Sequence, residues 1–467
     1  MVGAEAIGFA SSIAALVDII ATITVLDMSL GMKRPIGIAI SSGDLGKFKQ
    51  ILSSTILFVA IITIISVIII TVTNLRIPQF LGFDSQYIGI IIAMVFAMSF
   101  RYIFMEALIA SFRSKELTLP FLFGSLLRFP ILFALLYFLK GVTLATVLAY
   151  SSMIFISAGF FGFYSIKIFY GRTLVKATGN IVPNIKTILK AGLSSWIPHV
   201  INVLGYQLGI LTILNFGGGA SEAGKFYIPI GIFTVVLFIV TGMSKVAHPL
   251  VASMTTQKRQ ISFMSYSMKL AFIFTMPITA PLLFFADDFL GLMGREFASD
   301  GDVLSILIIS VPLVIIYELV YYFLYGKGYN KEILYLGLYG NIPRIILYFL
   351  LSPLLGAVGT ALGWLIGSSI QFIFTIKVAK QHSLSLEYRK YIILTAIPLT
   401  IGSITWIINM QFAISTIIII FGSLLLYIKL RLFADTELND LLYAGFPDNI
   451  AKKIYPVTLK IIHLIGR

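Results

Sequence analysis

Several charged side chains lie within segments that are otherwise almost wholly apolar, and their types and positions could support chemistry. If such a segment crosses a bilayer, a charge near its middle costs about 3 kcal/mol unless it faces a polar cavity or a partner. Each residue is therefore a candidate for substrate binding, for ion coupling or for a structural ion pair. The cations are Lys33, Arg34, Arg101, Arg128 and Arg344, and the carboxylates are Asp18, Asp27, Glu106 and Glu318.

The cations fit a cavity that holds an anion. Arginine suits phosphate in particular, because its planar guanidinium donates two parallel hydrogen bonds to one group. Arg34 and Arg101 have no counterpart elsewhere in the chain, which favours a role in substrate binding. Arg128 has a counterpart in Arg344, and this repetition favours a role in the scaffold.

The carboxylates allow two further hypotheses. They could bind a coupling proton or sodium ion, since an intramembrane carboxylate is a common relay element. Alternatively, three of them could neutralise three arginines as structural pairs. Arg101 and Glu106 are five residues apart, about 140° around a helix, so we expect them to have different partners. The structural hypothesis joins Arg101, Arg128 and Arg344 to Asp18, Glu106 and Glu318.

The remaining polar residues point to no cofactor and no metal. The chain has no cysteine, and its four histidines do not have the spacing of metal ligands. A single His199 beside Pro198 is more typical of a satisfied core residue than of a functional one. Asp287 and Asp288 are compatible with a metal site of a membrane glycosyltransferase, but an ordinary acidic loop explains them more simply.

The composition indicates an integral membrane protein. Hydrophobic residues make up 58% of the chain and charged residues 12%, against about 25% charged residues in a soluble domain. The runs 51–75 and 142–166 contain no charged residue, and about 20 apolar residues cross a bilayer as a helix. The net charge of +14 does not indicate nucleic-acid binding, because the basic residues lie between the apolar runs.

The chain contains an internal repeat. The run GSLLRFPIL, residues 124–132, returns as GNIPRIIL, residues 340–347, and Arg344 follows Arg128 by 216 residues. Lys115-Glu116 returns as Lys331-Glu332 at the same offset, and AEAIGF (4–9) returns as SEAGKF (221–226) at an offset of 217. Such spacing predicts two copies of one long module.

Hydropathy predicts an all-α polytopic fold with about 13 transmembrane helices. Two parallel pseudo-repeats, related by an axis along the membrane normal, are followed by two additional helices. The first copy has one helix fewer than the six of the second, so we expect one more apolar span encoded upstream of Met1, unless that helix has been lost. The predicted spans are 7–30, 51–72, 88–110, 117–138, 144–166, 191–215, 226–244, 270–285, 303–325, 333–351, 355–376, 391–408 and 412–428.

The predicted domains follow from these spans. The N-terminal lobe covers 1–170, a cytoplasmic linker 171–189 and the C-terminal lobe 190–379. The two additional helices occupy 390–430, and a cytoplasmic tail occupies 431–467. With the N-terminus outside, 27 of the 34 Lys and Arg residues lie in inside loops and in the tail, four lie outside and three lie within spans. This distribution follows the positive-inside rule.

Four stretches carry a resemblance to a known family. GAEAIGFA (3–10), the loop 30–52, the stretch 217–254 and GNIPRIILYFLLSPLLGAVGTALGWLIG (340–367) resemble polysaccharide flippases. These belong to the multidrug/oligosaccharidyl-lipid/polysaccharide exporter superfamily, and the resemblance covers essentially the whole chain. It implies two six-helix lobes around a central cavity, often with two added helices.

The resemblance also implies a function. It implies a plasma-membrane transporter, not an enzyme, that flips an oligosaccharide on a polyprenyl phosphate or pyrophosphate from the inner to the outer face. The basic cavity residues would meet the phosphate and acidic sugars. The implied partners are the lipid-linked glycan, membrane lipids and other glycan-assembly proteins, with no nucleic acid.

Three alternatives remain open from the sequence. A cation-coupled multidrug exporter of the same superfamily would need carboxylates and aromatic residues for cationic drugs, whereas the basic inner mouth favours anionic cargo. A membrane glycosyltransferase or ligase is disfavoured by the short outer loops. A non-transporting scaffold would follow from a true loss of the first helix.

The charge distribution makes a testable prediction of topology. Residues near Glu5 and Asp300 should face outside, and residues near Arg172 and Lys258 should face inside. The chain has no cysteine of its own, so single cysteines can be labelled with an impermeant reagent in intact cells. We expect labelling of Asp300→Cys and protection of Lys258→Cys; the reverse pattern would refute the topology.

Overall fold

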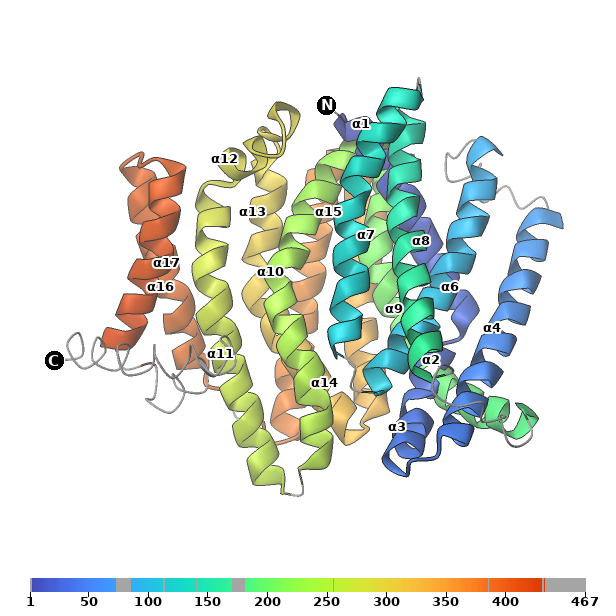
Figure 1. Ribbon diagram of the computed structural model, residues 1–467. Coiled ribbons are helices and arrows are strands. Elements are labelled where there is room, and N and C mark those ends of the chain that lie inside the picture. The colour runs from blue at the N-terminus through green and yellow to red at the C-terminus, as the bar shows by residue number, and fades with distance from the viewer. Residues whose placement is uncertain are drawn as a thin grey trace. The chain divides into compact units, whose positions relative to one another are not determined.

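The computed structural model describes residues 2–72, 85–111, 114–139, 141–169, 181–254, 256–384, 386–430 and 432 (Figure 1). Every regular element in these ranges is a helix. The helices are α1 (Ala4–Val25), α2 (Met28–Gly31), α3 (Lys33–Ser41), α4 (Leu45–Val72), η1 (Ser85–Tyr87), α6 (Ile88–Ala110), α7 (Ser114–Phe138), α8 (Val142–Phe169), α9 (Ile181–Phe216), α10 (Gly219–Ser253), α11 (Gln257–Phe284), α12 (Ala286–Gly291), η2 (Arg295–Phe297), α13 (Gly301–Ile309), α14 (Val311–Lys327), α15 (Asn330–Gln381), α16 (Tyr388–Ile407) and α17 (Phe412–Lys429).

Most of these helices have the length and composition of membrane spans. In the described residues, 11 helices are long and apolar enough to cross a membrane, or up to 12 if the bent pair α13 and α14 counts as one span. Every span predicted from hydropathy falls on helical segments, but 7–30 is broken between α1 and α2, and 303–325 is bent between α13 and α14. The higher predicted number arises because two of those spans, 333–351 and 355–376, lie together in α15. The protein is therefore a multi-pass membrane protein with an all-helical fold.

The 52-residue α15 is a hairpin of two helices that meet at Gly356. Gly356 has φ 55° and ψ −128°, a conformation that favours glycine. Beyond it, a Cβ atom built on Gly359 would lie 2.2 Å from Leu351 O, and one built on Gly367 would lie 2.6 Å from Arg344 Cβ. The second half therefore folds back along the first, and its small residues allow the close approach.

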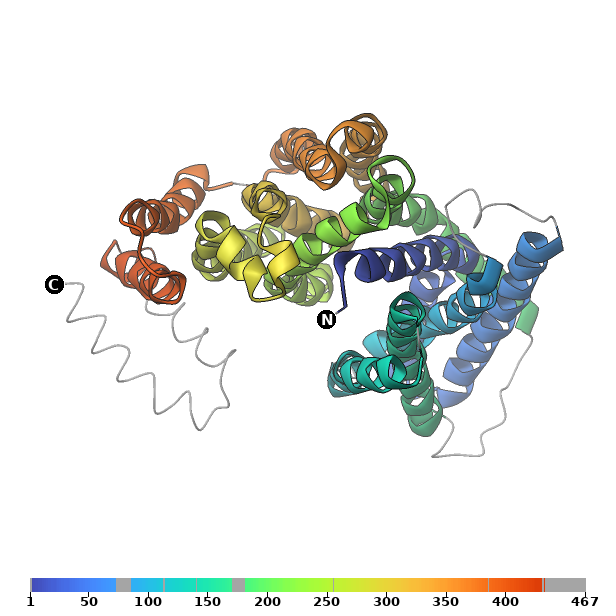
Figure 2. The same cartoon turned by 90° about the horizontal axis from the view of Figure 1, so that it is seen from above.

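The described chain forms two compact units. Unit 1 contains Met1–Ile228 and Asn330–Gln371, and unit 2 contains Pro229–Tyr329 and Phe372–Arg467. Within unit 1, α1 packs against α6, α8 and α9, and Figure 2 shows α1 in dark blue between α9 in green and the α7–α8 pair in teal. The lobe boundaries inferred from the repeat stay a prediction.

The predicted linker, 171–189, and the predicted tail, 431–467, are described only in part. The helix α9 already begins at Ile181, ten residues before the predicted span, so the end of the predicted linker is helical. Residues 171–180 and nearly all of the tail 431–467 lie outside the described residues.

Two glycines join the two copies of the repeat reciprocally. A Cβ atom built on Gly8 in α1 would lie 1.8 Å from Ala220 O, and one built on Gly224 in α10 would lie 1.9 Å from Ala4 O. Both equivalences, Ala4 with Ala220 and Gly8 with Gly224, have an offset of 216. The structure thus corrects the offset of 217 taken from AEAIGF and SEAGKF. Such a reciprocal contact is the geometry of a two-fold relation.

Within unit 2, the two additional helices pack against α11. The ring of Tyr391 in α16 stacks on Phe272 with centroids 4.8 Å apart. The Tyr427 hydroxyl of α17 donates a hydrogen bond of 2.5 Å to Leu394 O. In the same unit, Asp287 Oδ1 accepts a hydrogen bond of 3.0 Å from the Gly301 N–H at the start of α13. This acidic loop therefore stabilises a helix end.

The same loop refines the labelling site for the topology. Asp300 is 8% exposed, so a cysteine there would react slowly from either side of the membrane. The neighbouring Ser299 is exposed. Ser299→Cys is therefore the better reporter for this loop.

The glycine contact predicts a loss of stability. Gly8→Ala and Gly224→Ala should each destabilise the protein by about 1–3 kcal/mol, because the added methyl group meets backbone atoms that cannot rotate away. Gly89→Ala in α6 is the matched control, since nothing lies within 4 Å of a Cβ atom there. Thermal unfolding of the purified variants in detergent measures the effect. Equal midpoints for Gly8→Ala and Gly89→Ala would show that the contact is not tight.

Candidate functional site

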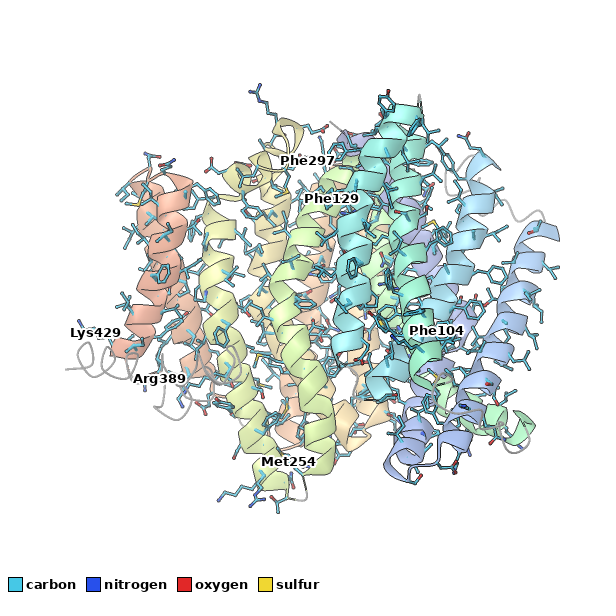
Figure 3. The ribbon with its side chains drawn as sticks, in the orientation of Figure 1. Phe104, Phe129, Met254, Phe297, Arg389 and Lys429 are labelled. Atoms are coloured by element: carbon cyan, nitrogen blue, oxygen red, sulfur yellow. The ribbon has the colours of Figure 1, made fainter. Side chains whose placement is uncertain are left out.

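All the in-span charged residues except Glu318 belong to unit 1, and four of them lie along α1 and the short helices that follow it. Four polar contacts connect this stretch to α6 and α9, and Figure 3 shows the side chains of these helices. Each contact brings together residues from distant parts of the sequence.

Asp18 in α1 has both carboxylate oxygens satisfied by neutral donors. Its Oδ1 accepts a hydrogen bond from the Tyr102 hydroxyl of α6, and its Oδ2 accepts one of 2.7 Å from Gln207 Nε2 of α9. The carboxylate therefore ties three helices together. Two good hydrogen bonds offset part of the cost of placing the group among apolar helices.

Asp27 lies at a break in the first span and pairs with His199. The helix α1 ends at Val25, and Leu26 and Asp27 have φ of 49° and 52°. A left-handed backbone costs roughly 1 kcal/mol or more for a residue other than glycine. Asp27 is 3% exposed, and its Oδ1 lies 3.0 Å from His199 Nδ1 of α9. The histidine, expected to be a plain core residue, thus holds the carboxylate at the break.

The break is also held by close backbone packing against α9. A Cβ atom built on Gly192 would lie 2.9 Å from both Leu26 O and Asp27 O. One built on Gly31 would lie 2.4 Å from Ile188 O. Small residues on both sides therefore allow α2 and α9 to touch at this point.

Lys33, at the start of α3, forms an ion pair with Glu106 of α6. The distance from Lys33 Nζ to Glu106 Oε2 is 2.5 Å, and the two side chains are 30% and 15% exposed. The side chain of the next residue, Arg34, lies outside the described residues. The Glu106 charge is therefore matched by Lys33, and not by Arg101 on the same helix, as their spacing predicts.

Arg101 of α6 has no carboxylate partner among the described residues. Its Nη1 donates a weak 3.4 Å contact to Met98 Sδ, and its guanidinium lies 5.0 Å from the centroid of the Phe121 ring of α7. The charge is stabilised by a ring face, which contributes about 0.5–2 kcal/mol, and its N–H groups stay available.

Arg128 of α7 is likewise held by rings. Its guanidinium lies 4.7 Å from the ring centroid of Tyr150 in α8 and 5.2 Å from that of the adjacent Phe129 (labelled in Figure 3). Tyr150 in turn contacts Tyr227 of α10, with ring centroids 5.9 Å apart. In the part of the chain that the structure describes, no carboxylate pairs with Arg128.

Arg344 differs from Arg128 although the repeat equates them. It is 2% exposed, and its guanidinium lies 4.0 Å from the centroid of the Trp364 ring. Its N–H groups donate to three neutral oxygens. The acceptors are Asn341 Oδ1 at 2.7 Å, Ser368 Oγ at 3.0 Å and Gln371 Oε1 at 3.4 Å. Asn341 is itself bound to Asn202 of α9 at 2.7 Å. This arginine is built into the α15 hairpin.

These contacts bear on the alternative of structural ion pairs. Among the described residues Asp18 binds neutral donors, Glu106 binds Lys33 and Arg344 binds neutral acceptors, so neither Asp18 nor Glu106 forms an ion pair with an arginine. Glu318, half-buried on α14, belongs to unit 2.

Arg101 of α6 and Arg128 of α7 lie at different levels along α7. The Arg101 guanidinium lies over the ring of Phe121, and Phe121 and Arg128 are seven residues, or two turns, apart in α7. The backbone positions of Phe121 and Arg128 therefore differ by about 10 Å along the axis of α7. The two arginines come from neighbouring helices and are staggered in depth.

Several partners of the charged residues were absent from the sequence analysis. These neutral residues carry no charge signal, and neither hydropathy nor charge counts single out an amide or a phenol. The polar residues at helix-facing positions of apolar spans would have been the available signal. They are Tyr102, Tyr150, Gln207, Asn341 and Gln371.

Solved structures share this fold. An inward-facing multidrug resistance MATE family transporter of the MOP superfamily superposes with a TM-score of 0.62 at 16% identity, covering 81% of this chain and 94% of that one. The lipid II flippase MurJ in an inward closed conformation gives 0.61 at 14% identity, covering 91% and 96%. An outward-facing MATE transporter gives 0.57 at 18% identity, covering 81% and 94%.

The sequence comparisons find no relative. No protein-family model matches the sequence, and no curated protein matches it. The likeness to transporters therefore lies in the fold.

The Lys33–Glu106 pair predicts energetic coupling. Lys33→Gln and Glu106→Gln should each lower the thermal midpoint, and the double variant should lose less than the sum, with a coupling of about 1 kcal/mol for a partly buried pair. The exposed pair of Lys390 and Glu387 is the matched control, with an expected coupling of about 0.3 kcal/mol. Additive losses at Lys33 and Glu106 would show that the pair contributes nothing.

Proposed function

We propose that the protein is a transporter that flips a glycan linked to a polyprenyl phosphate or pyrophosphate from the cytoplasmic to the outer face of the plasma membrane. It would do so by alternating access, in which the lobes expose the cargo site to one side at a time. The single observation that carries the proposal is the pair of staggered arginines, Arg101 and Arg128, which no carboxylate among the described residues neutralises.

The energetics of moving a phosphate group explain why such residues are needed. A bare anion in a low-dielectric region costs far more than thermal energy, and charge-assisted hydrogen bonds from arginine offset much of that cost. Release on the far side requires that no single group binds too tightly. Arg101 on α6 and Arg128 on α7 are staggered in depth, so they could pass the anion in steps.

The fold supports the same proposal. The solved structures that share it are multidrug transporters and a lipid II flippase, not enzymes. The flippase likeness extends over 91% of this chain. That structure carries the name of a lipid-linked substrate, which is the cargo class that we propose here.

A second candidate function, export of cationic drugs, is favoured by the equal likeness to MATE transporters. Such cargo would need carboxylates that are available to bind it. Asp18 and Glu106 are already bound by protein donors, whereas Arg101 and Arg128 have available N–H groups. For these four residues, the contacts favour an anionic cargo.

The driving force is part of the proposal. Asp27 is the carboxylate best placed to bind a coupling proton, because it lies at the break in the first span and contacts His199. Its second oxygen, Oδ2, is buried without a hydrogen-bond partner in the described residues. A proton on that oxygen would remove the charge and weaken the link to α9.

The test is delivery of glycan to the cell surface in a strain that depends on this protein. Arg101→Ala and Arg34→Ala should each reduce surface glycan while the protein stays in the membrane, and Arg→Lys should recover only part because ammonium lacks the planar fork. Arg295→Ala, on an exposed loop, is the matched control. Protein level is measured in the same membranes.

Two outcomes would contradict the proposal. Surface glycan at the parental level in both alanine variants would show that the arginines do not handle the cargo. Loss of both variants from the membrane would show instead that these arginines are structural.

A further inference from the structure

We propose that Arg128, oriented by Tyr150 and Phe129, is the residue that binds the phosphate of the cargo head group, whereas its repeat counterpart Arg344 serves only the scaffold. This inference rests on the proposed function and names one binding site within it. In the sequence analysis both arginines were candidates for the anion site, and their repetition favoured a scaffold role for both.

The repeat itself provides the comparison. Arg344 has four neighbours within the α15 hairpin, three acceptors for its Nη1 and Nη2 groups and the Trp364 ring, and its Nε alone has no partner among the described residues. If the first copy used Arg128 in the same way, the positions 216 residues earlier would carry similar groups. Three of the four counterparts cannot take the same role, because two of them are apolar side chains without an acceptor or an indole ring and one is a serine, shorter than asparagine. The counterparts of Asn341, Trp364, Ser368 and Gln371 are Ser125, Leu148, Ser152 and Phe155, in that order.

The one retained group is Ser152, the counterpart of Ser368. Its hydroxyl donates a hydrogen bond of 2.7 Å to Ala149 O, and among the described residues no hydrogen bond joins it to Arg128. The first copy therefore has the arginine without the amide acceptors and the indole ring that surround it in the second copy. A half-buried arginine without acceptors destabilises a membrane protein unless something else binds it, which indicates a ligand.

The arrangement around Arg128 suits an oxyanion. Two aromatic rings lie near the guanidinium, at 4.7 Å and 5.2 Å from their centroids, and fix its orientation without using hydrogen-bond donors. A guanidinium has five N–H donors in its plane. Planar donors held in one orientation match the paired oxygens of phosphate.

The depth of Arg128 in α7 indicates which of two possible ligands it binds, the transported cargo or the head group of an ordinary membrane lipid. Arg128 lies 14 residues from the start of α7 at Ser114 and 10 from its end at Phe138. At 1.5 Å per residue, it is about 15 Å or more from either end of the helix. A membrane lipid anchored in its own leaflet keeps its phosphate at the surface, so the phosphate that reaches Arg128 belongs to a molecule in transit.

The experiment measures binding of a defined probe to the purified full-length protein in detergent. The probe is farnesyl pyrophosphate, with farnesol as the control that lacks the phosphates. Arg128→Gln should weaken probe binding by about tenfold or more, the loss of one charge-assisted interaction, and leave farnesol binding and the thermal midpoint unchanged. Arg295→Gln is the matched surface control and should bind as the parent does.

A second variant keeps the arginine and changes only its surroundings. Ser125→Asn with Phe155→Gln restores the acceptors that Arg344 has, and it should weaken probe binding while preserving or raising the thermal midpoint. Should this variant fail to fold, the Arg128→Gln result decides alone. Arg344→Gln should lower the thermal midpoint markedly, because its neutral acceptors are left unpaired.

Parental affinity in Arg128→Gln would overturn the assignment of the site. Competition by phosphatidylglycerol as strong as that by unlabelled probe would also overturn it, since the site would then belong to membrane lipid. Neither of these two binding results would contradict the proposed function, provided that surface glycan still depends on the protein. If surface glycan does not depend on this protein while the probe still binds at Arg128, the proposed function is refuted but the binding site stands.

Discussion

The cost of a charge among apolar helices is the constraint on which the interior of unit 1 depends. A charged group there must be met by the protein or by a ligand. Asp18 is met by a phenol and an amide, and Lys33 and Glu106 are met by each other. Arg344 is met by amide and hydroxyl oxygens and by an indole face. Two charged residues remain, Arg101 and Arg128. Their guanidinium groups lie against aromatic rings, and their N–H donors have no carboxylate partner among the described residues.

Close backbone contact is what makes this arrangement geometrically possible. Gly8 and Gly224 let α1 and α10 touch reciprocally, and the glycines of the α15 hairpin let its two halves run side by side. In a membrane the association of helices depends on such packing, because lipid is as apolar as the helix surfaces. The same packing fixes the rotation of each helix and so determines which charged group meets which partner.

The helices and the repeat could be predicted from the sequence, but the partners of the charged residues could not. The length of an apolar run is enough to predict a membrane span, so every predicted span falls on helical segments. The break at Leu26 and Asp27 and the bend between α13 and α14 were not predicted. Which face of a helix turns toward which neighbour depends on contacts between residues far apart in the chain. The alternative that pairs arginines with carboxylates is not found for Asp18 and Glu106, whereas the different partners of Arg101 and Glu106 agree with their spacing.

The repeat was informative in one respect and misleading in another. It correctly placed Arg128 and Arg344 at equivalent positions, but equivalence of position was taken for equivalence of role. The acceptors that distinguish them lie up to 27 residues further along the chain, in the second half of the hairpin. Comparing the neighbourhoods of two repeated residues, and not only the residues, would have separated a scaffold arginine from one with unused donors.

The central claim is that the cargo's phosphate meets α6, α7 and α8 of unit 1. Photo-crosslinking tests it most directly, with a polyprenyl pyrophosphate analogue that carries a diazirine next to the pyrophosphate, followed by mass-spectrometric mapping of the modified residues. The account predicts crosslinks near Arg101 and Arg128 that unlabelled farnesyl pyrophosphate suppresses. Crosslinks confined to the α15 hairpin around Arg344, or crosslinks that the competitor does not suppress, would contradict it.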